Sequence, residues 1–256
     1  DIVMELVVEG VSKTYDDLLV LNQIDLTADE GQIVCIIGPS GCGKSTLLRL
    51  MGGLEEPSSG NIKTRGSPPS DCLNALTFIF QDFSLLPWRT VESNISLVLE
   101  DHPISNKEKQ EIINSVLQRT NLSEFSKRWP RELSGGMKQR VGIARALAVN
   151  PSILLMDEPL SALDSQTSEI LLNDLIDLWD KQRFTSIYIT HNLSEAIRIG
   201  HKIVVMSRRP GEVRETVNIE KALKERELRN IELEKYLWDL LKEEAEAAER
   251  EIGSET

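Results

Sequence analysis

Short, almost uninterrupted apolar runs recur along the chain, and each has the length of a buried β-strand rather than that of a helix. Turn-forming residues and longer segments with helical periodicity separate them. The runs are Ile33–Ile37, Ala75–Phe80, Ile153–Met156, Thr185–Thr190 and Lys202–Met206. Strands that alternate with helical segments predict an α/β fold built on a mixed or parallel sheet.

Two other parts of the pattern differ from these runs. Residues 4–27 alternate between apolar and polar positions in two segments, Leu6–Val11 and Leu18–Leu26, with Lys13–Asp16 between them. This alternation predicts an N-terminal antiparallel, hairpin-like β layer. The stretch Asn61–Asn74 is polar and contains prolines, so it is interpreted as a connecting loop.

Helical periodicity marks two further regions. From about residue 91 to 150 the apolar positions recur every three or four residues, as at Ile112 and Val116, which predicts a helical subdomain inserted between core strands. From residue 220 onward the chain is highly charged with apolar positions at helical spacing. We therefore expect one domain over residues 1–219 and a charged helical extension over residues 220–256.

Charge and cysteine content narrow the classes of function. The 41 acidic and 29 basic residues give a net charge of -12, which disfavours a nucleic-acid partner because such a partner needs a basic face. Much of the acid excess is typical of a solvated helix surface. We expect neither a membrane-spanning segment nor a signal peptide. Cys35, Cys42 and Cys72 are odd in number without metal-ligand spacing, so a reduced, cytosolic compartment is expected.

The first candidate site is a glycine-rich loop between the strand Ile33–Ile37 and a good helix former. Strand, glycine loop and helix are the context that a phosphate-binding loop requires, because consecutive N–H groups and the helix N-terminus face one concavity. Within it, Lys44 would reach the β- and γ-phosphates and the Ser45 hydroxyl would ligate Mg²⁺. The loop consists of Gly38, Pro39, Ser40, Gly41, Cys42, Gly43, Lys44, Ser45 and Thr46.

Further candidates stand at the ends of other predicted strands. Asp157 could hold Mg²⁺ through its water shell, and Glu158 could poise an attacking water. His191 ends the strand Thr185–Thr190, where it would be placed to touch a γ-phosphate. Tyr15, at the predicted hairpin turn, could stack on a nucleobase or could simply cover the sheet edge; its position alone leaves both interpretations open.

A second phosphate-binding helix start is predicted far along the chain. Ser134, Gly135 and Gly136 precede a predicted helix over Met137–Ala148, and a serine at a helix N-terminus leaves N–H groups pointing at a ligand. One chain with two such sites, far apart in sequence, invites a second copy to close over the nucleotide.

Taken in order, these motifs resemble those of ATP-binding cassette (ABC) ATPases over roughly Glu5 to Gly211. The matching segments are the Walker A loop at 38–46, the Q-loop glutamine Gln81, the signature Leu133–Arg140, the Walker B strand 153–158, the D-loop Ser161–Asp164 and the switch histidine His191. The resemblance implies a P-loop NTPase core that binds ATP and Mg²⁺. It also implies an adenine-stacking role for Tyr15, a general-base role for Glu158 and nucleotide contact by Asp164. Lys44, Gln81 and His191 take part in catalysis by the same resemblance, and Ser45, Gln81 and Asp157 hold the metal.

Three further stretches look like the ATPase subunits of bacterial nitrate, aliphatic-sulfonate and taurine importers: Leu85–Trp88, Arg131–Leu133 and Ser207–Gly211. This implies ATP-driven uptake of a small oxyanion through separate membrane and substrate-binding subunits, at the inner face of the cell membrane. Asn192 stands where relatives usually carry Asp, and the tail after Ile219 has no clear match. Importers of vitamin precursors share many of these sequence segments, so the identity of the solute stays open. A non-transport ABC ATPase is a further alternative.

An apolar run directly after Gln81 is a candidate partner site. Phe83 to Trp88 is turn-prone and poor in charge, and exposed apolar patches with tryptophan mark protein interfaces. The resemblance implies that a short cytoplasmic helix of the membrane permease docks there. The alternative is that these residues fill the seam between the core and the helical subdomain.

Overall fold

A computed structural model describes residues 4–82, 84–220 and 230–254. Contacts within the chain group these residues into two compact units. The central unit comprises residues 68–184, and the terminal unit joins residues 4–67 to the described residues from 185 onward. Each unit is described by itself below. The predicted boundary near residue 219 stays a prediction.

The terminal unit contains the predicted N-terminal β layer. β1 (Glu5–Tyr15) and β2 (Leu18–Ala28) form an antiparallel hairpin, with Leu6 opposite Ala28 and Tyr15 opposite Leu18. The turn is shorter than predicted, because Lys13, Thr14 and Tyr15 are still part of β1. Tyr15 is therefore the last residue of a strand rather than a turn residue.

The interpretation of Asn61–Asn74 as a loop was wrong in its first third. β4 (Ser59–Arg65) pairs with the free edge of β1 and completes a three-stranded antiparallel sheet in the order β2-β1-β4. Six of its seven residues are exposed, so the strand has no apolar alternation to reveal it. Backbone pairing and ion pairs such as Lys63 with Glu9 at 2.8 Å hold it instead.

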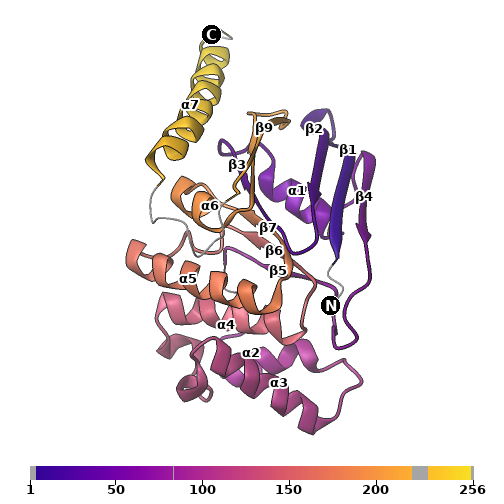
Figure 1. The fold of residues 1–256 in the computed structure, drawn as a ribbon, viewed down its shortest axis with the longest axis vertical. Helices are drawn as coiled ribbons and strands as arrows, with labels where there is room; N and C mark the ends of the chain where they lie inside the picture. The colour runs from indigo at the N-terminus through magenta and orange to yellow at the C-terminus, as the bar shows by residue number, and fades with distance from the viewer. Residues whose placement is uncertain (1–3, 83, 221–229, 255–256) are drawn as a thin grey trace. The chain divides into compact units, whose positions relative to one another are not determined.

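A second sheet in the terminal unit is formed by the predicted apolar runs. β3 (Ile33–Ile37) lies between β7 (Thr185–Ile189) and β8 (Lys202–Met206), and all three strands are parallel. All side chains of β3 and β7 are buried, which explains their continuous apolar sequence. β9 (Val213–Asn218), which the pattern did not reveal, pairs antiparallel with β8, so this sheet is mixed (Figure 1).

Three helices accompany this sheet. They are α1 (Lys44–Met51), α6 (Leu193–Ile199) and α7 (Ile231–Ser254). α7 packs against α6 and β8, and its Leu237 is fully buried. The tail is thus helical from Ile231, as predicted, whereas the predicted start near residue 220 is followed by residues outside the described part of the chain.

The central unit combines a parallel strand pair with a largely helical segment. β5 (Leu76–Ile79) pairs with β6 (Ile153–Asp157), with Leu76 opposite Ile153. Between them lie α2 (Val91–Ser96), α3 (Asn106–Arg119) and α4 (Gly135–Ala148), which pack against one another as Figure 1 shows. The predicted helical region at about 91–150 is confirmed. α5 (Ser165–Gln182) follows β6.

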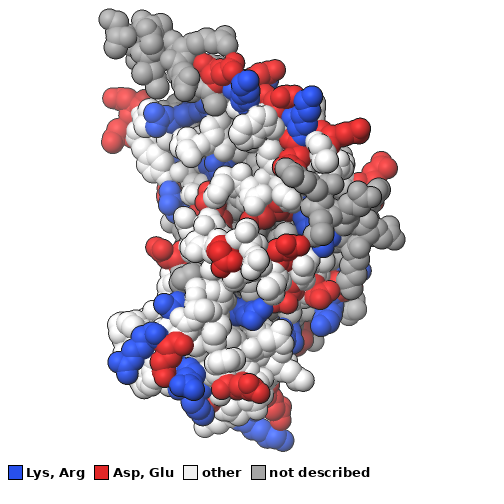
Figure 2. All heavy atoms as spheres, turned by 90° about the vertical axis from the view of Figure 1, so that its left-hand side faces the viewer, with Lys and Arg blue, Asp and Glu red and all other residues white. Residues whose placement is uncertain are grey.

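Among the described residues, none of the helices combines the length and the apolar composition that crossing a bilayer requires. On the face drawn in Figure 2, acidic and basic side chains are interspersed rather than gathered into a single basic patch. The expectation that nucleic acid is not a partner stays a prediction.

Candidate functional site

The glycine loop in the terminal unit joins β3 to α1, as the sequence predicts. α1 begins immediately after Gly43, whose φ of 105° lies in the left-handed region that favours glycine. Gly43 has no side chain that could cap the first turn of the helix. By contrast, side chains cap α2, α3, α4, α5 and α6, at Thr90, Ser105, Ser134, Asp164 and Asn192. A helix start without a side-chain cap suits an anion acceptor from outside, such as a phosphate.

The positive charge that would attract such an anion is supplied by a lysine inside the loop. Lys44 is only 8% exposed, and its Nζ donates to the carbonyl oxygens of Gly38 at 2.8 Å and Pro39 at 2.9 Å. The ammonium group therefore lies within the curve of the loop. Cys42 Sγ is 3.9 Å from Lys44 Nζ, yet burial raises the pKa of the Cys42 thiol despite the positive charge.

Tyr15 lies at the end of β1 beside a small charged cluster. Its hydroxyl donates to the carboxylate of Glu55, and Lys13 Nζ lies 4.9 Å from the centre of its ring. Arg49, on α1, pairs with the same carboxylate at 2.8 Å, and its Nη2 lies 3.5 Å from the hydroxyl of Thr46 in the loop. Burial and the Glu55 carboxylate raise the pKa of Tyr15. Tyr15 is 38% exposed, so its side chain is accessible to a stacking partner.

His191 follows β7 and lies at the same edge of the sheet as the glycine loop. The two strands run side by side, with Ile36 opposite Ile189, and the N–H of Thr190 donates to the carbonyl oxygen of Ile36 at 3.4 Å. Because the carboxyl ends of parallel strands meet at one edge, the structure brings His191 to the edge that carries Gly38.

A polar cluster that the sequence analysis missed supports the turn after His191. The Glu195 carboxylate accepts hydrogen bonds from the hydroxyls of Tyr188 at 3.1 Å and Thr190 at 2.8 Å, and Asn192 Nδ2 lies 3.3 Å from it. Burial raises the pKa of Glu195 above its ordinary value. The signal was available: Asn192 and Glu195 have the spacing of a capping box at the start of α6.

The departure from the family pattern at Asn192 leaves this turn intact. Asn192 Oδ1 accepts from the N–H groups of Ser194 at 3.0 Å and Glu195 at 3.3 Å, so it caps α6 as an aspartate would.

In the central unit, Gln81 and the two acidic residues stand at one edge of the strand pair. Asp157 is the last residue of β6, and Gln81 follows β5, with Ile79 opposite Met156. Glu158 has a φ of 45°, in the left-handed region that non-glycine residues rarely occupy. Such a conformation costs about 1–3 kcal/mol and is concentrated at functional sites.

The glycines of the signature segment bring two helix starts together in the central unit. A side-chain carbon at Gly136 would lie 2.5 Å from Thr167 Cγ2, so only glycine allows α4 to approach the first turn of α5 this closely. Ser134 Oγ accepts from the N–H of Met137 at 3.3 Å. Asp164 caps α5 by accepting from the N–H of Thr167 at 3.0 Å, and its hydrogen bonds to Thr167 lower the pKa of its carboxyl.

The predicted site residues thus form two groups, one in each unit. Tyr15, the glycine loop and His191 belong to the terminal unit, and Gln81, the acidic pair, the signature and Asp164 belong to the central unit. A strand, a glycine loop and an uncapped helix start that encloses a lysine define a P-loop nucleotide-binding protein.

Comparison with known proteins narrows this class. The profile of the ABC transporter family matches residues 21–161, more than half of the chain, and the chain belongs to that family. It therefore binds ATP and hydrolyses it, and the predicted resemblance to ABC ATPases and the α/β fold class are confirmed.

Individual relatives match over most of their length. An uncharacterized ABC transporter ATP-binding protein of Methanocaldococcus jannaschii is 37% identical over 94% of this chain and 92% of its own. A nitrate import ATP-binding protein of Synechocystis is 42% identical over 79% of this chain and 76% of its own. An aliphatic sulfonates import ATP-binding protein of Bacillus thuringiensis is 41% identical over 80% and 81%, respectively.

A solved structure resembles the chain closely. The dimeric post-hydrolysis state of an ATP-binding cassette, bound to ADP and phosphate, aligns with a TM-score of 0.72 and 32% identity, covering 85% of this chain and all of that one.

Proposed function

We propose that the chain is the ATP-hydrolysing subunit of a membrane importer for a small oxyanion. One observation carries this proposal: proteins named for the import of nitrate, bicarbonate and aliphatic sulfonates match about four-fifths of the chain at 42%, 39% and 41% identity. All three solutes present several oxygen atoms around a small central group. A vitamin-precursor importer and a non-transport ABC ATPase are the alternatives that the test below distinguishes.

Nucleotide binding is assigned to the terminal unit. Residues 38–46 would surround the phosphates with backbone N–H groups, and Lys44 would exchange its carbonyl partners for the β- and γ-phosphates. The ring of Tyr15 would stack on adenine, which contributes about 1–3 kcal/mol.

The residues assigned to Mg²⁺ fit its chemistry. Ser45, Gln81 and Asp157 offer hydroxyl, amide and carboxylate oxygens, the hard ligands that Mg²⁺ prefers together with water and phosphate oxygens. When bound, the metal would neutralise charge on the phosphates.

Hydrolysis is assigned to residues that end buried strands. Glu158 would take a proton from a water molecule as the water oxygen attacks the γ-phosphorus, and ADP would leave with the electrons of the broken bond. The left-handed backbone at Glu158 supports this role, because such strained conformations are concentrated at functional sites. His191 would contact the γ-phosphate from the end of β7, where the hydroxyl of the preceding Thr190 is held by the Glu195 carboxylate.

A second copy, or a homologous ATPase subunit, would complete each site. In a head-to-tail dimer, the start of α4 with Ser134, Gly135 and Gly136 would face the γ-phosphate bound by the other chain, and Asp164 would lie at the same junction. The adjacency of the α4 and α5 starts within one chain supports this, because it presents both as one surface. The dimeric structures of related cassettes are consistent with it.

The membrane partner is assigned to the segment after Gln81. Trp88 is 68% exposed, Leu85 and Leu86 are half-buried, and Phe83 lies outside the described residues. An exposed tryptophan in an apolar segment is typical of a docking anchor. A permease bound there would hold the chain at the inner face of the membrane, and a substrate-binding protein would act through that permease.

The test is solute-stimulated ATPase activity. The chain is purified with its permease, reconstituted, and supplied with the substrate-binding partner and a panel of nitrate, bicarbonate, sulfonates and vitamin precursors. Stimulation by one oxyanion class is expected. Stimulation by a vitamin precursor alone would favour the second importer class, and failure to co-purify with any permease would favour a non-transport ABC ATPase.

A further inference from the structure

The turn Ser207–Glu212 joins β8 to β9 and is in contact with the glycine loop. The proposed function gives this turn no role. Gly211 donates its N–H to the carbonyl oxygen of Val20 at 2.8 Å, and its own carbonyl accepts from the N–H of Asn22 at 3.0 Å. The turn is therefore joined to β2 by backbone hydrogen bonds.

Contact with the loop itself is closer still. A side-chain carbon at Gly211 would collide with the carbonyl oxygen of Cys42, so only glycine fits between the turn and the loop. A side-chain carbon at Gly38 would lie 3.0 Å from the carbonyl oxygen of Met206, the residue that precedes the turn. Because the contact is this close, a displacement of the turn would also displace the phosphate-binding loop.

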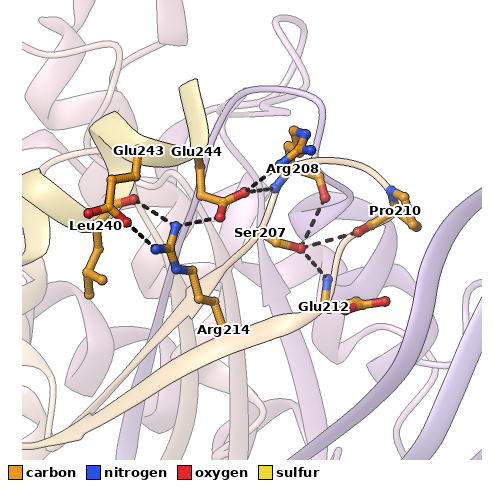
Figure 3. A network of polar contacts seen from close by, with 8 residues as sticks. All are labelled: Ser207, Arg208, Pro210, Glu212, Arg214, Leu240, Glu243 and Glu244. Carbon is orange, nitrogen blue, oxygen red and sulfur yellow. Dashed lines mark hydrogen bonds and ion pairs between the residues drawn. The ribbon is translucent and has the colours of Figure 1, made fainter. Parts of the chain in front are cut away.

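The C-terminal helix holds the other side of the turn (Figure 3). Glu244 on α7 is only 8% exposed, and its carboxylate accepts the backbone N–H of Arg208 at 2.9 Å. It also pairs with the guanidinium groups of Arg208, at 3.6 Å, and of Arg214 on β9. Arg214 in addition binds the carbonyl oxygen of Leu240 at 3.3 Å and the carboxylate of Glu243.

These contacts form a continuous chain from the tail to the nucleotide site. It runs from Glu244 to the backbone of Arg208, through Gly211 to Cys42, and all of its members belong to the terminal unit. The Glu244 carboxylate is nearly buried and accepts the Arg208 N–H while it pairs with two half-buried guanidinium groups, so these charge-assisted contacts hold it in one orientation. Leu237, two helical turns before Glu244, is fully buried, and α7 packs against α6 and β8.

We propose that Glu244 is a positioning residue: the C-terminal helix braces the Ser207–Glu212 turn and thereby holds the phosphate-binding loop in its nucleotide-competent shape. The tail after residue 219 thus sets nucleotide affinity without touching the nucleotide. This rests on the proposed nucleotide site at residues 38–46. By reciprocity, a nucleotide bound in that loop strengthens the contact between α7 and the turn.

The test uses the full chain and measures binding of ADP with magnesium by calorimetry. Glu244→Gln keeps an oxygen acceptor for the Arg208 N–H but removes the charge, whereas Glu244→Leu removes both. We expect the ADP dissociation constant to rise by at least about fivefold in Glu244→Leu, the lower end of typical coupling between sites, and by less in Glu244→Gln. Arg214→Met, which attacks the cluster from β9, should weaken ADP binding in the same direction.

The matched control is Glu246→Gln, the same change two residues further along α7, where the glutamate is exposed and pairs with Lys242 on the same helix at 3.6 Å. It should leave the ADP affinity unchanged. A merely structural role for Glu244 would lower the melting temperature while ADP bound as in the wild type, and that result would overturn the proposal.

A second measurement needs no variant. Amide hydrogen exchange of the wild-type chain, with and without ADP, should slow at Arg208 and along residues 231–244 when ADP is bound. Unchanged exchange at both places would also overturn the brace. Lys44→Ala serves as the reference: it should abolish ADP binding, and if it does not, the loop assignment has failed rather than the role of Glu244.

Discussion

Glu158 combines the two properties expected of a residue held for chemistry: a carboxylate directly after a buried strand and a left-handed backbone that a glutamate does not adopt without cost. Glu158→Gln retains size and hydrogen bonding but cannot accept a proton. We expect ATP binding to persist while turnover falls by at least about 10²–10⁴-fold, the contribution of a positioned base. Steady-state hydrolysis and nucleotide binding by the pure variant check this.

The variant should also accumulate as an ATP-bound dimer on size exclusion. The conservative swap Glu169→Gln, on the exposed face of α5, controls for loss of a carboxylate in general. Hydrolysis near the wild-type rate by Glu158→Gln would contradict the base assignment and direct attention to His191.

Glu195 gives a prediction that depends on pH. Because burial raises its pKa, the folded chain holds a proton that the unfolded chain has lost, so the contribution of Glu195 to stability is complete below its ordinary pKa of about 4.3 and declines as pH rises through the raised value. Glu195→Gln lacks this titration. The free energy of unfolding of the wild type minus that of the variant should therefore fall as pH rises, with a slope of at most about 1.4 kcal/mol per pH unit.

Urea unfolding of both proteins over a pH series measures this difference. Glu232→Gln, at an exposed position on α7, provides the comparison, since its difference from the wild type should hardly change with pH. A pH-independent difference for Glu195→Gln would show that the carboxyl titrates normally.

At the scale of elements, the helix N-termini fall into two kinds, with and without a side-chain cap. α2, α3, α4, α5 and α6 are capped by their own side chains, whereas α1 begins at a glycine and encloses Lys44. In the proposed dimer, α1 of one chain and α4 of the other would meet at the γ-phosphate. That places half of each active site on each chain.

Complementation between two inactive chains tests this division. Lys44→Ala and Ser134→Arg, each in a Glu158→Gln background, should fail to form ATP-dependent homodimers. Mixed, they should form heterodimers, because one site is then intact and the other carries both defects. Size exclusion with ATP gives the answer: a mixture with no more dimer than either variant alone contradicts a shared site, and mixing two Lys44→Ala samples is the control.

At the scale of the whole molecule, Trp88 is the proposed anchor for the membrane partner. A tryptophan that packs between the core and the helical subdomain would be buried, and its truncation would lower the free energy of unfolding by about 3–5 kcal/mol. Trp88 is 68% exposed, which disfavours that role. Trp88→Ala should leave the free energy of unfolding within about 0.5 kcal/mol of the wild type. Association with the permease should weaken by about 2 kcal/mol or more, as for an interface anchor.

Thermal unfolding of the isolated chain and pull-down with the permease measure the two effects. Trp238→Ala, a similarly exposed tryptophan on α7, should affect neither. A large loss of stability with association preserved in the folded fraction would reject the docking role.

The sequence by itself determined the features that are local in the chain. A buried parallel strand needs a continuous apolar run, and a phosphate loop needs glycines and a lysine at fixed spacing, so β3, β6, β7 and the loop at 38–46 could be located directly. The helical region at about 91–150 followed from its periodicity for the same reason. The order of the motifs was then enough to predict the family, because each motif depends on a local backbone geometry.

The tertiary structure decided what depends on partners distant in sequence. β4 pairs through its backbone with β1 and is almost wholly exposed, so its side chains carry no strand pattern. Glu244 appears as one glutamate among many in a charged tail until folding places it against Arg208, 36 residues away. Backbone pairing and buried ion pairs depend on proximity in space rather than on local propensity, and for that reason neither the third strand nor the brace could be predicted from the chain alone.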